Sequence, residues 1–378
     1  MRDVYVLGTG MVPFTRYRVD QTPALVRESG VRALTDAGCT FADVEAVYMA
    51  AAHPLAPRGI LVAKELGLNG APLQHVDNAS ATGTSALHEA WMAVGSGLAD
   101  TAIVLAYDVA PPTLSVADVI ESEDNVPPVA LFAMWARRRM HDAGTRPEHL
   151  AMVAAKNWNY ARENPYAVRR AQEPVTVEAV LASREVASPL RSMMCTAWCD
   201  GAGAVVLGSA EALERFGSDR PAIRLASSVL RSETYEPGHV FLGAIVGPPA
   251  MTRATVTRSL EAAGLGPADL DVVQVHDAFA IEEIVYYELL GFTEPGETER
   301  LLEQGAFGPG SKERFGLPEF STGGGLIARG HPGGPTGVAQ VHETVARLRD
   351  PATRDRHGLC HMLGAGSMCV AQVLVREG

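Results

Sequence analysis

The chain has 378 residues, of which 47% are hydrophobic and 20% charged, and its formal net charge is −12. This composition is ordinary for a globular protein with a sizeable core, and the length allows one large or two medium domains. The net acidity argues against nucleic acid as the main partner, because phosphate binding needs clustered lysine and arginine.

The cysteines and the apolar runs point to a cytoplasmic protein. Five cysteines at irregular spacing do not resemble a secreted disulfide framework, and the first residues lead directly into a predicted strand. No apolar run reaches the roughly 18–20 residues of a spanning helix. Neither cysteine nor histidine spacing fits a metal site. We therefore expect no membrane span and no metal.

The chain opens on "VYVLGTGMVP" (4–13), which predicts a strand followed by a turn. A dinucleotide-binding loop is excluded, because Pro13 stands where its third glycine belongs and no helix opens there. Residues 78–90, "NASATGTSALHEA", then read as a tight small-residue bend and a helix. This pattern is typical of a turn that carries a nucleophile, and Ser80 occupies the bend.

An internal repeat organises the chain. Residues 33–47 ("ALTDAGCTFADVEAV") and 259–273 ("SLEAAGLGPADLDVV") align without gaps, and each predicts a helix that ends at a glycine, followed by a strand. The repeat predicts two similar α/β halves. We place them at 1–207 and 222–378, with a polar linker at 208–221. Residues of about 108–192 form an insertion that is expected to shape a binding site.

Six further segments occur in an order that is typical of one family. They are "KNWNYARENPYA" (156–167), "VLASREVASPLR" (180–191), "CDGAGAVVL" (199–207), "HDAF" (276–279), "GGLIARGHPGGPTGVAQ" (324–340) and "HMLGAGSM" (361–368). Together they resemble the lipid-transfer-protein, or sterol-carrier-type, branch of the thiolase superfamily. The resemblance implies a five-layered αβαβα fold made of two similar halves, a homodimer, and a role in lipid metabolism. It also implies acyl-CoA substrates and chemistry at the carbon–carbon bond beside the thioester carbonyl.

The thiols on which such enzymes depend are missing. Ser80, Ala278 and Met362 stand where the resemblance places cysteines. Cys360, two residues from Met362, is expected to face elsewhere and to belong to the core. A helix dipole of about 1 kcal/mol cannot ionise a serine hydroxyl, so Ser80 would need an adjacent base such as His331.

The remaining polar residues suggest how the site works. The resemblance implies that His276 and His331 bind the thioester oxygen, directly or through water, and so stabilise an enolate. Asp277 either orients a histidine or caps the following helix, and Tyr235 is a candidate base. We also expect Gly330, Gly364 and Gly366 to lie at the substrate, because glycine permits close approach of the chain. His361 is expected either to contact the substrate or to satisfy backbone groups.

Three functions stay open at this point. The first is retro-aldol cleavage of a β-hydroxyacyl-CoA without an acyl-enzyme, as in relatives from steroid side-chain degradation that use a small zinc-ribbon/OB-fold partner protein. The second is acyl transfer in which Ser80 or another group replaces cysteine. The third is a catalytically silent subunit that binds acyl-CoA or lipid. In each case CoA enters as part of the substrate, and no other cofactor is expected.

Overall fold

The computed structural model describes residues 1–53, 59–110, 127–217, 219–234 and 249–378. Its main sheet has ten strands in the order β10-β9-β11-β12-β8-β1-β7-β4-β2-β3. The N-terminal strands are β1 (Tyr5–Met11), β2 (Ala46–Ala50), β3 (Leu73–Val76), β4 (Thr101–Asp108) and β7 (Gly201–Gly208). The C-terminal strands are β8 (Ile223–Ser232), β9 (Val272–Gln274), β10 (Glu319–Phe320), β11 (His357–Gly364) and β12 (Met368–Arg376).

The two halves of the sheet have the same topology. If the five strands of each half are numbered in chain order, their order in the sheet is 3-2-4-5-1 in both halves. The halves meet where β1 pairs antiparallel with β8. This symmetry is the structural form of the sequence repeat. The limits 1–207 and 222–378 stay predictions, although β7 ends at Gly208 and β8 begins at Ile223.

Helices cover both faces of the sheet, and two of them pack between the strands of its two halves. They are α1 (Thr22–Ala37), α2 (Gly59–Ala63), α3 (Thr82–Ser96), α5 (Pro128–Ala143), α6 (Pro147–Glu163), α7 (Val177–Ala182), α8 (Ala210–Phe216), α9 (Pro249–Ala263), α10 (Ala280–Leu289), α11 (Thr298–Glu303), α12 (Ser311–Phe315) and α13 (Pro335–Arg349). Helix α8 lies within the predicted linker. No helix in the described ranges is long and apolar enough to cross a membrane.

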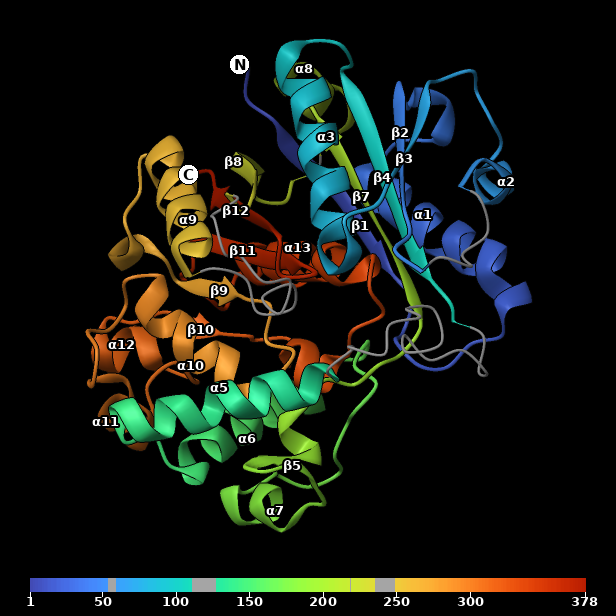
Figure 1. Ribbon diagram of the computed structural model, residues 1–378. Coiled ribbons are helices and arrows are strands. Elements are labelled where there is room, and N and C mark those ends of the chain that lie inside the picture. The colour runs from blue at the N-terminus through green and yellow to red at the C-terminus, as the bar shows by residue number, and fades with distance from the viewer. Residues whose placement is uncertain (54–58, 111–126, 218, 235–248) are drawn as a thin grey trace.

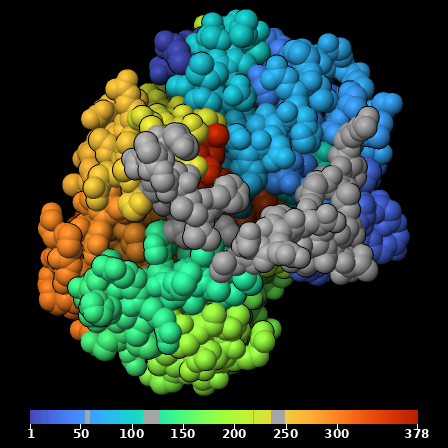
Figure 2. Space-filling model, in the orientation of Figure 1, coloured from blue at the N-terminus to red at the C-terminus, as the bar shows by residue number. Residues whose placement is uncertain are grey.

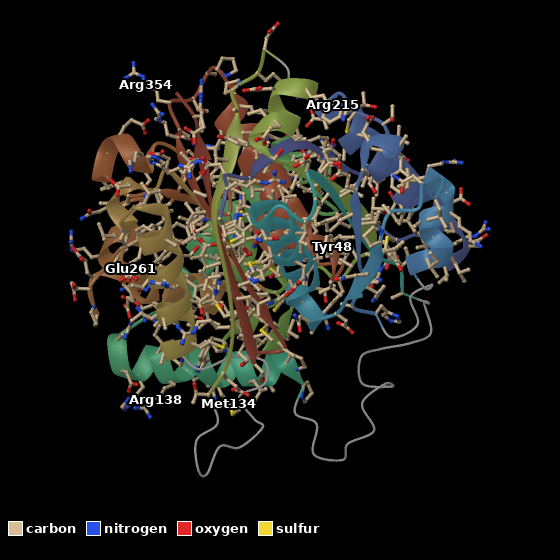
Figure 3. All side chains as sticks on the ribbon, turned by 90° about the horizontal axis from the view of Figure 1, so that it is seen from above. Tyr48, Met134, Arg138, Arg215, Glu261 and Arg354 are labelled. Carbon is tan, nitrogen blue, oxygen red and sulfur yellow. The ribbon has the colours of Figure 1, made fainter. Side chains whose placement is uncertain are left out.

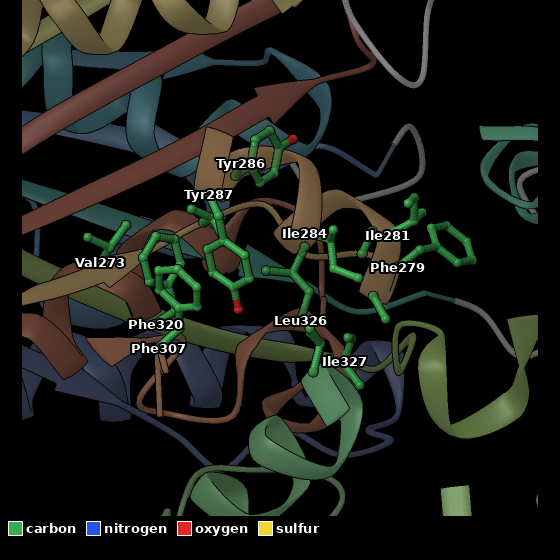
Figure 4. Packing of buried hydrophobic residues seen from close by; sticks show 14 of the residues in the cluster. Val273, Phe279, Ile281, Ile284, Tyr286, Tyr287, Phe307, Phe320, Leu326 and Ile327 are labelled. Carbon is green, nitrogen blue, oxygen red and sulfur yellow. The ribbon is translucent and has the colours of Figure 1, made fainter. Parts of the chain in front are cut away.

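Three apolar clusters define the layers. One joins α1 to the outer face of the N-terminal strands, and a second joins α3 and α13 to strands of both halves. The third joins the C-terminal strands to α5, α6, α9 and α10, and its aromatic centre stacks Tyr287 on Phe307 with ring centroids 3.7 Å apart (Figure 4). Outer helices, strands, central helices, strands and outer helices thus form the expected αβαβα arrangement, and the fold class is confirmed.

The two central helices cross at very short range. A Cβ built on Gly83 would lie 2.2 Å from the carbonyl oxygen of Gly334, and one on Gly337 would lie 2.4 Å from Thr84 Oγ1. Only glycine permits this approach. The crossing brings the head of α3 and the loop before α13 into one place, which is where the site forms.

The insertion packs on the C-terminal half of the molecule. Helices α5, α6 and α7 lie together beside α10 and α11 (Figures 1 and 2). Arg139 of α5 donates to Glu288 at 2.6 Å and to Glu299 at 3.0 Å, and these ion pairs fix the helix to that half. The opposite side of α5 presents Met134 and Arg138 to solvent (Figure 3).

Candidate active site

Ser80 lies in a short, tightly held turn at the head of α3. The turn is the 3₁₀ segment Ala79–Ala81, and Ala79 has a φ of 50°, which is a strained value for a residue with a side chain. The backbone N–H of Asn78 donates to Thr82 Oγ1 at 2.8 Å. A Cβ at Gly364 would lie 2.2 Å from the Asn78 carbonyl oxygen, so the end of β11 packs directly against the turn.

His331 reaches Ser80 from the loop before α13. Its backbone N–H donates to the Ala197 carbonyl at 2.9 Å, and the imidazole Nε2 lies 3.0 Å from Ser80 Oγ. The other ring nitrogen, Nδ1, lies 2.7 Å from Thr336 Oγ1. The structure therefore brings together the predicted serine and histidine, and Thr336 is the orienting group that the sequence did not reveal.

The hydrogen-bond partners of His331 indicate which ring nitrogen carries the proton. Thr336 is fully buried, and His331 Nδ1 is the acceptor that its hydroxyl finds in the described part of the chain. If Nδ1 carried the proton, the threonine hydrogen would be buried without an acceptor, at a cost of about 1–3 kcal/mol. We therefore assign the proton to Nε2. His331 is then a hydrogen-bond donor toward Ser80.

His331 is also uncharged. Burial is the main cause that lowers the pKa of His331 well below its usual value, and the nearby His276 and Arg329 act in the same direction. A neutral imidazole with its proton on Nε2 donates one hydrogen bond and does not accept there. This is the arrangement needed to stabilise an oxyanion.

His276 lies beside His331 but has a different partner. The two rings meet edge to face with centroids 5.7 Å apart. His276 Nδ1 lies 2.9 Å from Glu282 Oε1, and Glu282 Oε2 accepts the backbone N–H of Phe279 at 3.0 Å. Sequence reasoning missed Glu282. The signal was present, because Glu282 stands three residues after the N-cap of α10, where a capping glutamate is common.

Asp277 does neither of the things expected of it. Its Oδ1 accepts the backbone N–H of Leu326 at 2.8 Å, and its Oδ2 accepts from Asn157 Nδ2 at 2.8 Å. It thus anchors the loop of residues 323–330 that leads to His331, while Glu282 contacts the histidine and caps α10. Burial, followed by the neighbouring Glu283, raises the pKa of Asp277 well above its usual value.

Within the described residues, His361 does not satisfy backbone groups, which was the alternative to a contact with the substrate, and the substrate contact stays a prediction. Its side chain is fully buried on β11, and neither ring nitrogen has a hydrogen-bond partner in the part of the chain that the structure describes. The ring packs edge to face on Tyr286 at 4.8 Å. Burial, with a smaller contribution from His276, lowers the pKa of His361 to about 3.

This buried imidazole makes the free energy of unfolding depend on pH. A histidine titrates near pH 6.5 in the unfolded chain, so between pH 6.5 and pH 5 the unfolded state binds a proton that native His361 does not. His361 therefore lowers the free energy of unfolding by about 2 kcal/mol when the pH is lowered from 7 to 5. In urea denaturation, we expect the free energy of unfolding of His361→Gln to fall less between pH 7 and pH 5 than that of the wild type, by this amount. Equal falls in both proteins would contradict the prediction.

The usual thiol positions hold no sulfhydryl group. Ala278 is buried near the site, and Met362 packs with Ala81 and Val370. Cys195 Sγ lies 3.2 Å from the Arg191 carbonyl, and the Cys199 thiol lies behind Gly330 in a cluster with Met11 and Phe14. Burial raises the pKa of Cys195 to about 11 and that of Cys199 to about 12. Neither is a ready nucleophile.

Cys360 belongs to the core, as expected, but for a different reason. Residues two apart on a strand share a face, so the expectation that Cys360 and Met362 face different ways is wrong. Cys360 lies on the same face of β11 as Met362, two residues before it. It packs against the central helices, and its Sγ lies 3.4 Å from Thr344 Oγ1. Burial raises its pKa to about 12.

The remaining predicted site residues are three glycines, which the structure describes, and Tyr235, which it does not. Gly330 has a φ of 117° and Gly366 a φ of 74°, and Gly364 contacts the Ser80 turn as described above. Tyr235 lies outside the described residues. Within the described ranges, no group of three or more histidine, cysteine, aspartate or glutamate side chains could hold a metal ion.

An exposed aromatic ring packs against the imidazole pair. Trp198 pairs with His331 through a parallel backbone bridge, and the two rings lie 4.9 Å apart. The indole is 53% exposed, which is unusual for a tryptophan. An apolar ring therefore stands at the edge of the site, next to the donor nitrogen of His331.

Comparison with known proteins identifies the family. Residues 248–375 match a family model described as thiolase C-terminal domain-like. The chain is 34% identical to a benzoylsuccinyl-CoA thiolase subunit, BbsB, of Thauera aromatica over 97% of this chain and 95% of that one. It is 37% identical to an acetyl-CoA acetyltransferase of Methanothermobacter thermautotrophicus, over 96% of this chain and 97% of that one.

Two further similarities concern the branch and the fold. Sterol carrier protein 2 of Gallus gallus is 31% identical over 98% of this chain and 71% of its own length. A solved structure titled Ltp2-ChsH2(DUF35) aldolase superposes with a TM-score of 0.83 at 22% identity, covering 99% of this chain and 98% of the other. The sequence relatives and the repeated α/β halves together show that the chain belongs to the thiolase superfamily, in its sterol-carrier-type branch, without the usual cysteines.

Proposed function

We propose that this protein is an acyl-CoA enzyme that cleaves a β-hydroxyacyl-CoA by a retro-aldol reaction and forms no acyl-enzyme. The observation that carries the proposal is the pair of contacts of His331, with Nε2 3.0 Å from Ser80 Oγ and Nδ1 2.7 Å from the buried Thr336 Oγ1, from which we assign the proton to Nε2. A donor imidazole stabilises an anion on the thioester oxygen but cannot remove the serine proton. The thiol positions offer no alternative nucleophile, because they hold Ser80, Ala278 and Met362.

The reaction balances without a further reactant. A base removes the proton of the β-hydroxyl, the Cα–Cβ bond breaks, and the oxygen becomes the carbonyl of a departing ketone or aldehyde. The electron pair of the broken bond forms the thioester enolate, whose oxygen accepts a hydrogen bond from His331 Nε2. A proton then adds to Cα and gives the shortened acyl-CoA. CoA serves as part of the substrate, and the proposal includes no other cofactor.

The relatives support this reaction class and a partner. One solved structure with a similar fold is titled as an aldolase of two components, Ltp2 and ChsH2(DUF35), and BbsB is named a subunit. We propose that this chain also works with a small partner protein of the zinc-ribbon/OB-fold kind and forms a homodimer. The acyl group would be a steroid, an aromatic or a fatty chain, and the exposed Trp198 offers any of these an apolar surface.

One observation favours a second function, acyl transfer through Ser80. The Ser80 Oγ to His331 Nε2 distance of 3.0 Å is that of a serine and its base. Two relatives, one named a thiolase subunit and the other an acetyl-CoA acetyltransferase, would support this chemistry. It needs the opposite tautomer of His331, however, in which the buried Thr336 hydroxyl loses its acceptor. A silent acyl-CoA-binding subunit is the third alternative.

The products distinguish the three functions. Purified protein, alone and with the small proteins encoded beside it, would be incubated with steroid, aromatic and fatty β-hydroxyacyl-CoAs. The proposal predicts a ketone or aldehyde and a shortened acyl-CoA in equal amounts. Transfer of an acyl group to free CoA would support the second function instead. Tight binding of acyl-CoA without turnover in any mixture would support the third.

A further inference from the structure

The two imidazoles of the site have different hydrogen-bond partners, and this difference assigns them different roles. His331 Nδ1 faces a hydroxyl, which can donate, whereas His276 Nδ1 faces a carboxylate, which when ionised can only accept. If the His276 ring carries one proton, that proton then lies on Nδ1, and Nε2 carries a lone pair. The neighbouring rings thus present opposite groups, a donor nitrogen on His331 and an acceptor nitrogen on His276.

Glu282 is held in place by three hydrogen-bond partners. Its side chain is fully buried, and its oxygens receive His276 Nδ1 at 2.9 Å, the Phe279 backbone N–H at 3.0 Å and the Tyr286 hydroxyl at 3.3 Å. It also lies in the first turn of α10, where the helix dipole favours negative charge. These donors fix the position of Glu282 and supply the compensation that a buried carboxylate needs when it carries charge.

The acceptor nitrogen of His276 is available to a ligand. We find no protein partner for Nε2 among the residues that the structure describes, and the ring retains a small exposed fraction of 7%. His276 Nε2 is the ring nitrogen that does not face Glu282. The rings of His276 and His331 are 5.7 Å apart at their centroids. The β-hydroxyl and thioester oxygens of one substrate stand on carbons two bonds apart, so a single molecule can contact both rings.

We propose that His276 is the base of the retro-aldol reaction and that Glu282 is the positioning residue that makes it so. This inference rests on the proposed function and supplies the group that removes the β-hydroxyl proton. His276 Nε2 takes that proton as Cα–Cβ breaks, and the resulting imidazolium is stabilised by the Glu282 carboxylate. The same proton then returns to Cα of the enolate, which restores the neutral ring. His331 holds the enolate oxygen throughout.

The tautomer of His276 is measurable without any substrate. Protein labelled with ¹⁵N-histidine would be studied by NMR, with the His276 signals identified by their loss in His276→Gln. We expect a protonated Nδ1 and a pyridine-type Nε2 for His276, and the reverse for His331. A protonated Nε2 on neutral His276 would overturn the proposal. This readout uses the unaltered protein and is independent of the substrate.

The kinetic test replaces the carboxylate by its neutral counterpart. Glu282→Gln is expected to lower kcat by about 10²–10³-fold, the usual size of a general-base contribution, while KM changes by less than about fivefold. Its ¹⁵N spectrum should show a mixture of His276 tautomers. The matched control is Glu319→Gln, another buried glutamate, which bonds to Tyr160 and Arg347 away from the imidazoles. That variant should keep kcat within about threefold.

The outcomes separate this inference from the proposed function. Unchanged kcat in folded Glu282→Gln, with the wild type active as a lyase, would overturn the inference and leave the function standing. A wild type that cleaves no β-hydroxyacyl-CoA would count against the function and the base role together. Thermal unfolding of each variant shows whether it is folded. If Glu282→Gln does not fold, the wild-type tautomers decide the question.

Discussion

Replacing His331 by alanine is expected to lower kcat for β-hydroxyacyl-CoA cleavage by about 10²–10³-fold, which is the usual effect of losing one oxyanion donor. The imidazole is neutral, is oriented by Thr336, and directs its Nε2 proton toward Ser80 Oγ. Its hydrogen bond strengthens as charge develops on the thioester oxygen, so the loss should appear in kcat more than in KM. Steady-state kinetics with the best substrate from the product screen would measure it.

His342→Ala is the matched control for this substitution. His342 is also a largely buried histidine near the same loop, on α13, but its Nδ1 bonds to Thr9 Oγ1 at 2.9 Å and its ring meets Tyr166. We expect it to lower stability and to leave kcat of the folded protein within about threefold. Near-wild-type kcat in His331→Ala, or equal losses in both variants, would show that His331 does not stabilise the transition state.

Removing the amino group of Lys156 is expected to destabilise the protein by about 3–5 kcal/mol, because it leaves buried carboxylates without their cation. Lys156 Nζ lies 2.8 Å from Glu283 Oε1, with the two side chains 9% and 0% exposed. Asn157 bonds both to Glu283 and to Asp277, which in turn holds Leu326 of the His331 loop. Urea denaturation of Lys156→Met would measure the loss.

The double variant Lys156→Met/Glu283→Gln tests the cause of that loss. It removes both charges of the pair, so the unpaired carboxylate no longer contributes, and we expect at least half of the stability to return. A loss below 1 kcal/mol in the single variant would contradict the account. So would a double variant that is less stable than the single one, since the two changes would then act independently.

Much of the fold followed from the sequence, and the repeat explains why. Residues 33–47 and 259–273 are local patterns, each a helix ended by glycine and followed by a strand, and local patterns predict local structure. Their duplication predicted two halves, which share one strand order. The packing of the insertion on the C-terminal half was not predictable, because it depends on ion pairs such as Arg139–Glu288 between distant segments.

The site was predicted only in part. The positions of Ser80, His276 and His331 came from the family motifs, and the structure places the first beside the third at 3.0 Å and the two imidazoles side by side. The roles of the imidazoles depend on second partners, Thr336 and Glu282. The two imidazoles had been expected to act alike on the thioester oxygen. Which proton each ring carries follows from the hydrogen bonds on its other side, and these are set by tertiary packing.

Asp277 shows the limit of arguing from proximity in sequence. It adjoins His276, yet its side chain is directed to Leu326 and Asn157, whereas Glu282, six residues from His276, reaches the ring. A helix start places the side chain of its third residue back over the preceding segment, so Glu282 was the better candidate on geometry.

Whether any residue of this chain carries the acyl group can be measured with Ser80→Ala and with the intact mass of the wild type during turnover. We expect Ser80→Ala to keep kcat within about tenfold of the wild type, and protein quenched in the steady state to show no added acyl mass. A loss of several orders of magnitude, with an acyl adduct on Ser80 or on any cysteine of the wild type, would contradict this expectation.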